Sequence, residues 1–476
     1  MKHDTYVENG FYYSDWTKKH LVGYDDHYEF GKEIVIPDSV KTMSVYALNE
    51  FNAPDSTLFL PQIKSTSPSF SNANIKKVVF KEGVREIPEK LFMDSNVKEV
   101  VLPSSLEIIG MQAFLRSKTR KVNLENVKSI EKEAFYNSDI EQVKLNKLES
   151  NFQSIFRECK KLKEAELNIK IVPPCTFLGC KKLKNVKLNN TTRISFDAFN
   201  DNISLKHIIF PPALRTIEMS AFSGSGLEEI IIPKNVETIS SYAFFVSKSL
   251  SKIEFEDGPL SLDIGSNVFV QSPAEIVSFP KRAVRIGSNV LQDMPNLKTL
   301  YVHSDIEAIE DGFATNCEKL ENIYLNPKIK SIGENSFKNC AITEIGKQFK
   351  NIKEFGYACF SDCSKLKNAF IGKGSKLSHY VFASCENLET VIFDNVFFTD
   401  KIYIFNNSNP VVYMSDKKEL YDISETYDIK DLSEIPTEKL KDFVDLISYK
   451  NVSEQFEPIL FAALTFREIQ KLEKTR

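Results

Sequence analysis

The sequence of 476 residues has little of what membrane proteins and nucleic-acid-binding proteins usually contain. Its longest apolar run, residues 458–466, is half the length of a membrane-spanning helix, which needs roughly 18 residues. The net charge is −4, and lysine and glutamate are mixed along the chain as on a solvated surface. These absences argue against a membrane span, and they give no reason to expect nucleic acid as a partner, because that usually requires a basic stripe.

Residues suited to catalysis are also sparse. The six histidines fall in different parts of the chain, at His3, His20, His27, His207, His303 and His379. A catalytic triad or a metal site needs such groups within hydrogen-bonding reach of one another. The sequence therefore predicts no catalytic residue, no metal, no cofactor and no enzymatic activity.

The first residues lack the apolar core of a secretory signal. Met1 is followed by Lys2, His3 and Asp4. From the sequence we expect a cytoplasmic protein, or one whose leader has been removed.

What the sequence does contain is a phenylalanine that returns every 21 to 25 residues. Leu48 and Leu291 fill the position where phenylalanine is missing. The period is carried by Phe70, Phe92, Phe114, Phe135, Phe156, Phe177, Phe199, Phe222, Phe244, Phe269, Phe313, Phe337, Phe360, Phe382 and Phe405. A fixed period of this length is typical of a stacked solenoid, in which each repeat contacts only its neighbours.

Each repeat begins with a short run that favours a β-strand. In residues 97–114 the run is Val100 to Leu102, and Pro103 ends it because proline cannot donate to a strand ladder. Similar runs follow at the same spacing as far as residues 411–413. Strands that recur in this way must stack in parallel, since the chain returns to the same edge before each new strand. The sequence predicts a parallel β-sheet on one face and a core of stacked phenylalanine, isoleucine and leucine.

The two ends differ from the repeats. Residues 1–33 are rich in tyrosine and charge and predict a β-rich cap or an atypical repeat. Residues 34–414 form the solenoid, with about 17 repeats. Residues 415–476 predict a small helical segment, because Leu440, Phe443, Val444 and Ile447 share one helical stripe and a second helical stretch follows from about residue 458. This segment either caps the last repeat or binds a partner.

The repeated phrase resembles the BspA-type (Treponema-type) leucine-rich repeat. The resemblance rests on pairs such as Ala113-Phe114 and Ile332-Gly333, and on Cys317 followed three residues later by Leu320. It covers roughly residues 34–413. It implies a solenoid with a parallel sheet on one face and short turns or helical segments on the other. It also implies a non-enzymatic protein that acts in adhesion or protein recognition, with a secreted or cell-surface location as the alternative to the cytoplasm.

Six of the eight cysteines occupy one repeat position. Cys159 and Cys180 are equivalent, and so are Cys317, Cys340, Cys363 and Cys385 in four later repeats. Equivalent residues of adjacent turns lie about 5 Å apart, which is close enough for a disulfide. A buried thiol that packs and bonds a loop carbonyl fits the same position and is the favoured interpretation. Zinc is disfavoured because the sequence has no CxxC pair.

The strand face is the best place to look for a binding site. The middle residue of each strand run should point outward by the two-residue period. These residues are charged in the middle of the array, whereas near its end they are apolar: Tyr301, Tyr324, Phe370, Ile392 and Val412. Exposed aromatic residues on one face are common anchors of protein interfaces. Strand propensity alone would also produce such an apolar row, and so would a cover formed by the C-terminal helices.

The sequence therefore predicts a non-enzymatic recognition or adhesion protein. Its partner would be a protein, for example a host or cell-surface protein, bound on the strand face through these five residues. The alternative makes the repeats a targeting arm and residues 415–476 the docking or effector module.

Overall fold

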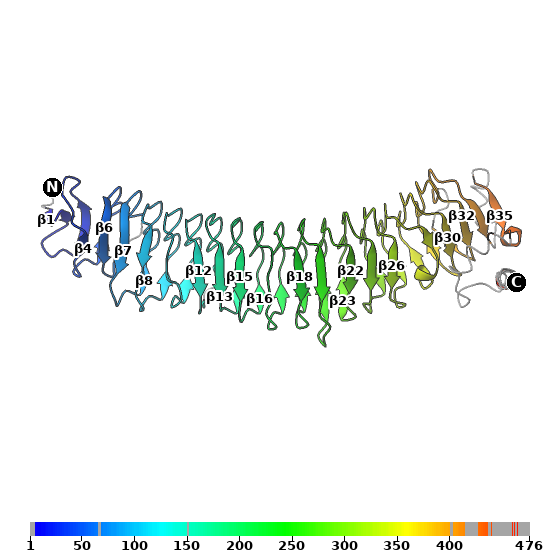
Figure 1. The fold of residues 1–476 in the computed structure, drawn as a ribbon, viewed down its shortest axis with the longest axis horizontal. Coiled ribbons are helices and arrows are strands. Elements are labelled where there is room, and N and C mark those ends of the chain that lie inside the picture. The colour runs from blue at the N-terminus through cyan, green and yellow to red at the C-terminus, as the bar shows by residue number, and fades with distance from the viewer. Residues whose placement is uncertain are drawn as a thin grey trace, which may run out of the picture. The chain divides into compact units, whose positions relative to one another are not determined.

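The computed structural model describes residues 5–64, 68–149, 152–399, 403–414 and 427–436, with the single positions Lys439, Ile459, Phe461 and Leu464. Backbone contacts divide the chain into two units, residues 1–236 and 237–476. Both units are built from the same kind of turn (Figure 1).

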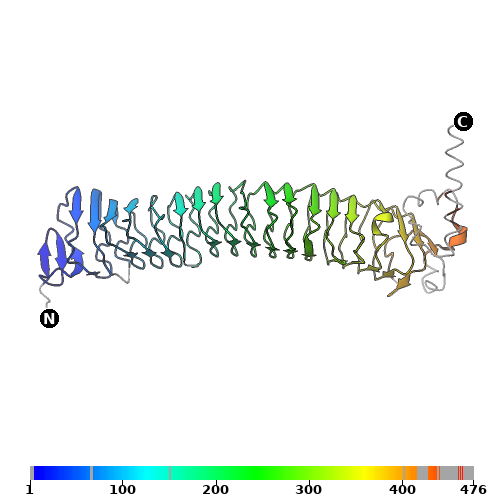
Figure 2. The same ribbon diagram turned by 90° about the horizontal axis from the view of Figure 1, so that it is seen from below.

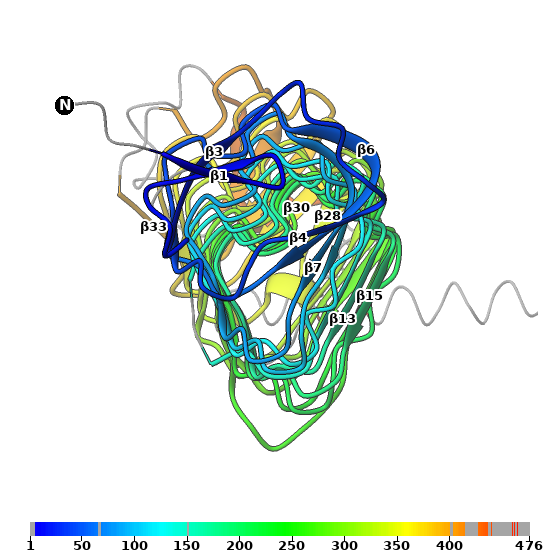
Figure 3. The ribbon, with the colours of Figure 1, turned by 90° about the vertical axis from the view of Figure 1, so that its left-hand side faces the viewer.

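Each turn carries two short strands that face different sides of the solenoid. We call the longer strands ladder A and the shorter ones ladder B. Ladder A of unit 1 contains β4 (Glu33–Val35), β6 (Asn52–Leu60), β7 (Asn74–Phe80), β9 (Glu99–Val101), β12 (Gln142–Leu145), β13 (Glu164–Leu167), β15 (Asn185–Leu188) and β18 (Glu229–Ile232). Figure 3 shows β4, β7, β13 and β15 along one side of the turns.

Ladder B of unit 1 consists mostly of strands of two residues. They are β5 (Thr42–Met43), β8 (Glu86–Ile87), β10 (Ile108–Ile109), β11 (Ser129–Ile130), β14 (Ile171–Val172), β16 (Arg193–Ile194) and β17 (Thr216–Ile217). The resemblance implied turns or helical segments on this side. The structure instead has a second parallel ladder, because a pair such as Ile108–Ile109 aligns in register with Ser129–Ile130 of the next turn.

Unit 2 repeats this arrangement, seen from a second direction in Figure 2. Its ladder A contains β20 (Lys252–Phe255), β22 (Ile276–Phe279), β24 (Thr299–Val302), β26 (Asn322–Leu325), β28 (Glu344–Ile345), β30 (Asn368–Ile371), β32 (Thr390–Phe393), β34 (Val411–Met414) and β35 (Ile429–Asp431). Its ladder B contains β19 (Thr238–Ile239), β21 (Leu262–Ile264), β23 (Ala283–Ile286), β25 (Ala308–Ile309), β27 (Ser331–Ile332), β29 (Glu354–Phe355), β31 (Lys376–Leu377) and β33 (Phe397–Phe398). The parallel sheet predicted from the strand runs is confirmed in both units.

The phenylalanines stack in a column inside the turns, as predicted. Phe114 and Phe135 lie 4.7 Å apart between ring centroids with an angle of 3° between their planes, and Phe135 continues onto Phe156 at 5.2 Å. All three are fully buried. Burying a side chain of this size contributes about 2 to 3 kcal/mol, provided that the neighbouring turns cover it.

The turn around each phenylalanine forms a third set of backbone bonds. Gln112 and Arg116, two residues before and after Phe114, have φ of 55° and 53°. This left-handed conformation is uncommon outside glycine. It is held because the N–H groups of Gln112, Phe114 and Arg116 donate to carbonyls of the next turn, at 3.1, 2.7 and 2.9 Å. The same geometry recurs from turn to turn and explains why the period is so regular.

One predicted member of the column is wrong by one residue. The N–H of Leu291 donates to the carbonyl of Phe313, and the N–H of Ala314 donates to Ser336, so Ala314 occupies the position that phenylalanine has elsewhere. Phe313 is nevertheless fully buried and packs edge-on against Phe279 at 5.9 Å. Spacing alone could not separate these neighbours, because the spacing from Leu291 is within the range seen between other repeats.

The N-terminal residues adopt a different arrangement. Strands β1 (Tyr6–Glu8), β2 (Phe11–Tyr13) and β3 (His20–Tyr24) pair antiparallel, and β3 then pairs in parallel with β5. These strands, blue in Figures 1 and 2, lie at the end of unit 1. A capping role for residues 1–33 stays a prediction.

Ladder A continues past residue 414. Strand β35 pairs in parallel with β34 and is followed by a short 3-10 helix, η3 (Leu432–Glu434), which Asp431 caps. The other described 3-10 helix is η1 (Lys347–Phe349). The helices predicted from residues 437 and 458 onward fall almost entirely outside the described residues.

Candidate functional site

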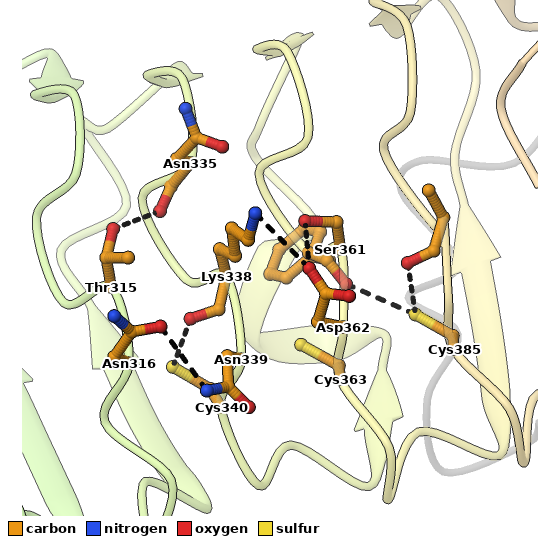
Figure 4. Close-up of polar contacts among 12 residues, drawn as sticks. Thr315, Asn316, Asn335, Lys338, Asn339, Cys340, Ser361, Asp362, Cys363 and Cys385 are labelled. Carbon is orange, nitrogen blue, oxygen red and sulfur yellow. Dashed lines mark hydrogen bonds and ion pairs between the residues drawn. The ribbon is translucent and has the colours of Figure 1, made fainter. Parts of the chain in front are cut away.

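The repeated cysteine position is a hydrogen-bonding site inside the turns that carry these cysteines. Cys363 Sγ donates to the carbonyl of Phe337 at 3.3 Å, and Cys385 Sγ donates to that of Phe360 at 3.2 Å. Figure 4 shows Cys340, Cys363 and Cys385 on successive turns. Ser408 occupies the same position one turn later, and its Oγ donates to the carbonyl of Phe382 at 2.8 Å. The predicted packing role is therefore confirmed, because thiol and hydroxyl satisfy the same carbonyl.

All eight cysteines lie in the described part of the chain and are buried and free. Burial raises the pKa of the Cys317 and Cys385 thiols to about 12. Thiols with so high a pKa are neutral at physiological pH, and the neutral form is a poor nucleophile. These cysteines serve the structure of the turns.

Two of the five predicted binding residues form a stacked, solvent-accessible pair. Tyr301 of β24 and Tyr324 of β26 are in register, and their rings stack at 4.7 Å with an angle of 9°. Tyr324 is 52% exposed and Tyr301 is half-buried. The His303 ring also stacks with Tyr301, at 5.7 Å between ring centroids. The three side chains make a small aromatic surface on ladder A.

The remaining three predicted residues are not exposed, which corrects the prediction. Phe370 and Ile392 do lie in the outward row, but only 6% and 0% of their surfaces are exposed. Val412 pairs with the inward residue Val391, so the outward residue of β34 is Tyr413, which is 3% exposed.

Two described residues beyond position 427 contact this part of ladder A. Lys439 Nζ donates to Thr390 Oγ1 at 3.2 Å, and Thr390 is itself buried on the outer side of β32. Lys430 of β35 lies beside Tyr413 in the ladder. Lys430 and Lys439 therefore lie against this part of ladder A, as expected if the C-terminal segment covers the apolar row.

The exposed and covered parts of the row are separated by a glycine. Ile345 pairs with Ala369, so Gly346 lies opposite Phe370. Gly346 also precedes η1 and has no side chain to extend the aromatic surface from Tyr324. The accessible aromatic surface of ladder A in unit 2 thus centres on Tyr301 and Tyr324.

The strand face of unit 1 carries a groove that the sequence did not reveal. Its volume is about 1130 Å³, and its floor consists of the outward residues of successive strands. Many of its charges pair across strands, for example Lys144 with Glu125 at 3.6 Å. Ile209, at one end of the groove, is 85% exposed. The charged middle of the array was visible in the sequence, but not the hollow that it lines.

A second aromatic row was also missed. Tyr357, Tyr380 and Tyr403 lie on successive turns just before the column phenylalanines, and Tyr380 stacks on Tyr403 at 5.3 Å. Tyr357 and Tyr403 are exposed. A tyrosine that recurs two or three residues before the phenylalanine was the available signal.

No group of three His, Cys, Asp or Glu residues that could hold a metal ion occurs among the residues that the structure describes. The described part of the chain also contains no helix that is both long and apolar enough to cross a membrane.

Comparisons with known proteins agree with this architecture. The model of the BspA-type leucine-rich repeat region matches in six copies, over residues 30–98, 85–202, 170–298 and 284–412. A leucine-rich repeat protein from Bacteroides ovatus is similar in structure, with 20% identity and a TM-score of 0.54, over 90% of this chain and 96% of that one.

Further solved structures have lower scores. The pneumococcal vaccine antigen PcpA has 18% identity and a TM-score of 0.37, over 91% of this chain and 99% of that one. A leucine-rich cell surface protein from Faecalibacterium prausnitzii has 16% identity and a TM-score of 0.31, over 88% and 96%. No curated protein matches significantly. With the family model matching most of its length, the chain belongs to the BspA-type leucine-rich repeat family.

Proposed function

We propose that the protein is a non-enzymatic recognition or adhesion protein that binds a protein partner through ladder A of unit 2. The observation that supports this most is the stacked pair of half-buried Tyr301 and exposed Tyr324. Tyrosine is enriched at the centres of protein interfaces because it combines a large apolar surface with a hydroxyl. Leucine-rich repeat proteins generally act in protein interaction or adhesion, which favours the same function.

The stacking of the pair makes it suited to binding. Each ring restrains the other, and the stacked His303 ring further restrains Tyr301. Less side-chain entropy is then lost when a partner binds, and this loss costs about 0.5 to 1.5 kcal/mol for each mobile side chain. The polar residues Ser278 and Asn322 beside the pair leave the surroundings solvated, as in the rim of an interface.

The experiment compares proteins captured by immobilised wild type, by Y301A/Y324A and by the control Y357A/Y403A. The control removes two exposed tyrosines from another edge of unit 2. We expect a protein that wild type and control retain and Y301A/Y324A loses. With this partner purified, affinity for Y301A/Y324A should fall by at least about tenfold, since residues at the centre of an interface contribute about 2 kcal/mol or more. Equal affinity for all three would rule out this site.

The alternative, in which residues 415–476 are a docking or effector module, is less favoured. Two of the described residues of this segment, Lys430 and Lys439, lie against ladder A.

A further inference from the structure

Lysines without a carboxylate partner gather on one edge of unit 1. Between residues 116 and 206 the chain has nineteen Lys and Arg but only eleven Asp and Glu, a net charge of +8 in a protein whose total is −4. The rest of the chain is therefore acidic, and the overall balance conceals a basic segment.

The fold places many of these charges between the column phenylalanine of a turn and the ladder A strand that follows it. Some of the lysines there are neutralised, such as Lys161 by Asp139 at 2.7 Å and Lys163 by Glu141 at 3.7 Å. Eight exposed lysines of this segment have no carboxylate within ion-pairing distance among the described residues. Six of them lie at this edge or in the adjoining strand: Lys118, Lys121, Lys160, Lys182, Lys184 and Lys187. We call these six residues the lysine strip.

The lysine strip runs along the axis of unit 1. Its residues belong to three turns, whose ladder A positions are Lys121, strand β13 and strand β15, and the turn of strand β12 between the first two contributes none. Neighbouring strands lie about 4.8 Å apart, so the strip is about 14 Å long. A strip of this direction and length suits an extended ligand with regularly spaced negative charges.

Two hollows flank the lysine strip. On the turn side a cleft of about 630 Å³ is lined by Lys118 and Lys160. Its two carboxylates, Asp94 and Asp139, are already paired with Arg116 and Lys161. On the strand side, Lys121, Lys184 and Lys187 line the groove of ladder A. Five glutamates line it too, of which Glu99, Glu125 and Glu141 are paired with lysines, while Glu164 and Glu166 form no ion pair among the described residues. A ligand chain on the strip can therefore reach lysines from either side.

The residue types that line the two hollows indicate which class of polyanion fits them. No Phe, Tyr or Trp lines either hollow, so the surface has no platform for stacking the bases of a single-stranded nucleic acid. The free cations are lysines, which act as point charges without the planar bidentate geometry of arginine. The guanidinium of Arg116 already holds Asp94 through two bonds of 2.7 and 2.8 Å.

Amide side chains complete the lining. Asn72, Asn96 and Asn137 line the cleft, and Asn123 and Asn185 line the groove. Amides donate and accept hydrogen bonds and so suit the hydroxyl groups of a sugar. We propose that the lysine strip binds a linear acidic polysaccharide, with lysine ammonium groups at its sulfate or carboxylate groups and asparagine amides at its hydroxyls.

The test measures binding of the full-length protein to immobilised heparin, a sulfated polysaccharide. The variant K160E/K182E/K184E reverses three charges in the strip. The control K32E/K147E/K170E makes the same change in net charge at exposed lysines of unit 1 that lie outside the strip. We expect wild type and control to bind within about twofold of each other, and the strip variant to bind at least about tenfold more weakly, because such contacts release counterions and are steeply salt-dependent. Equal weakening of both variants would overturn the proposal.

Further probes identify the ligand class. Binding to polygalacturonate that depends on the strip supports recognition of carboxylates as well as sulfates. Binding to neutral dextran as strong as to heparin would overturn the role of charge, and tighter strip-dependent binding to a DNA duplex would assign the strip to nucleic acid instead. Thermal unfolding of all variants verifies that they fold. Because Tyr301 and Tyr324 lie in the other unit, failure here leaves the proposed protein-binding site untouched, and the reverse also holds.

Discussion

At the scale of single residues, the repeat is held by one side-chain position that accepts several chemistries. Cys, Ser and Asn all occur three residues after the column phenylalanine, and Asn202 Nδ2 donates to the Phe177 carbonyl at 2.7 Å just as Cys180 Sγ donates to Phe156 at 3.0 Å. An unsatisfied buried carbonyl costs about 1 to 3 kcal/mol, so a small donor here stabilises the turns in which it forms the bond. At Ser95, Ser117 and Ser225 the buried hydroxyl has no hydrogen-bond partner, and these turns do without it. The hydrogen bond explains a cysteine ladder without disulfide or metal chemistry.

The buried thiols should make stability depend on alkaline pH. Burial raises the pKa of Cys317 and Cys385 to about 12, from 9.0 for a solvated thiol. Above pH 9 the unfolded chain releases these protons while the folded chain keeps them. Stability is therefore fully present below pH 9 and is lost as the pH rises toward 12. We expect the loss to be about 1 kcal/mol per thiol for each pH unit within this window.

The measurement is the free energy of unfolding in denaturant at pH 8 and pH 10. The control is C317S/C385S, because serine keeps the hydrogen bond, as Ser408 does, and does not ionise in this range. Wild type should lose more stability than the variant over this interval. An equal loss in both proteins would contradict the assigned burial of the thiols.

At the scale of elements, the stability of each turn depends on contacts with its neighbours. Phe135 illustrates this, since its ring is packed between Phe114 and Phe156 and is fully buried. A strand pair of two residues, such as β10 with β11, offers few hydrogen bonds of its own. The stacked phenylalanines therefore provide much of the stabilisation between adjacent turns, because the short strands form few hydrogen bonds.

Removing one phenylalanine ring from the column should lower the stability of the protein substantially. We expect F135A to lower the free energy of unfolding by about 3 to 5 kcal/mol, because it leaves a cavity between two rings. The control F152A removes a phenylalanine that is 42% exposed in the same unit, and should change stability by about 0.5 kcal/mol or less. Chemical denaturation monitored by circular dichroism measures both. Similar values for the two variants would show that the column contributes little.

At the scale of the whole molecule, the ends of a solenoid need protection because each turn buries its apolar side chains only against its neighbours. The outward row Phe370, Ile392 and Tyr413 shows an additional need, since apolar side chains point away from the core and are still buried. The described contact of Lys439 with Thr390 lies on this side of ladder A.

Removal of residues 437–476 should therefore uncover this row. We expect greater binding of a hydrophobic dye such as ANS and a lower melting temperature than for the full chain, because an apolar patch becomes exposed. A variant that lacks only residues 467–476 is the control for shortening the chain as such. Dye binding equal to that of the full chain would show that residues 437–476 do not cover the row.

The sequence by itself determined the solenoid, because the phenylalanine period and the alternation within each strand reflect local contacts between adjacent turns. It also determined the role of the cysteines, because six of them share one repeat position and therefore have the same kind of surroundings in each turn. It did not determine Ala314 in place of Phe313, because a one-residue shift leaves the spacing ambiguous and only the backbone bonds decide it.

Only the tertiary structure decided which outward residues are accessible. Tyr324, Phe370 and Ile392 have the same alternation in the sequence, yet the first is exposed and the others are buried. Alternation specifies the direction of a side chain, whereas exposure depends on distant segments that pack over it. The lysine strip arose in the same way, since an overall charge of −4 gives no sign of lysines that the turns bring to one edge without carboxylate partners.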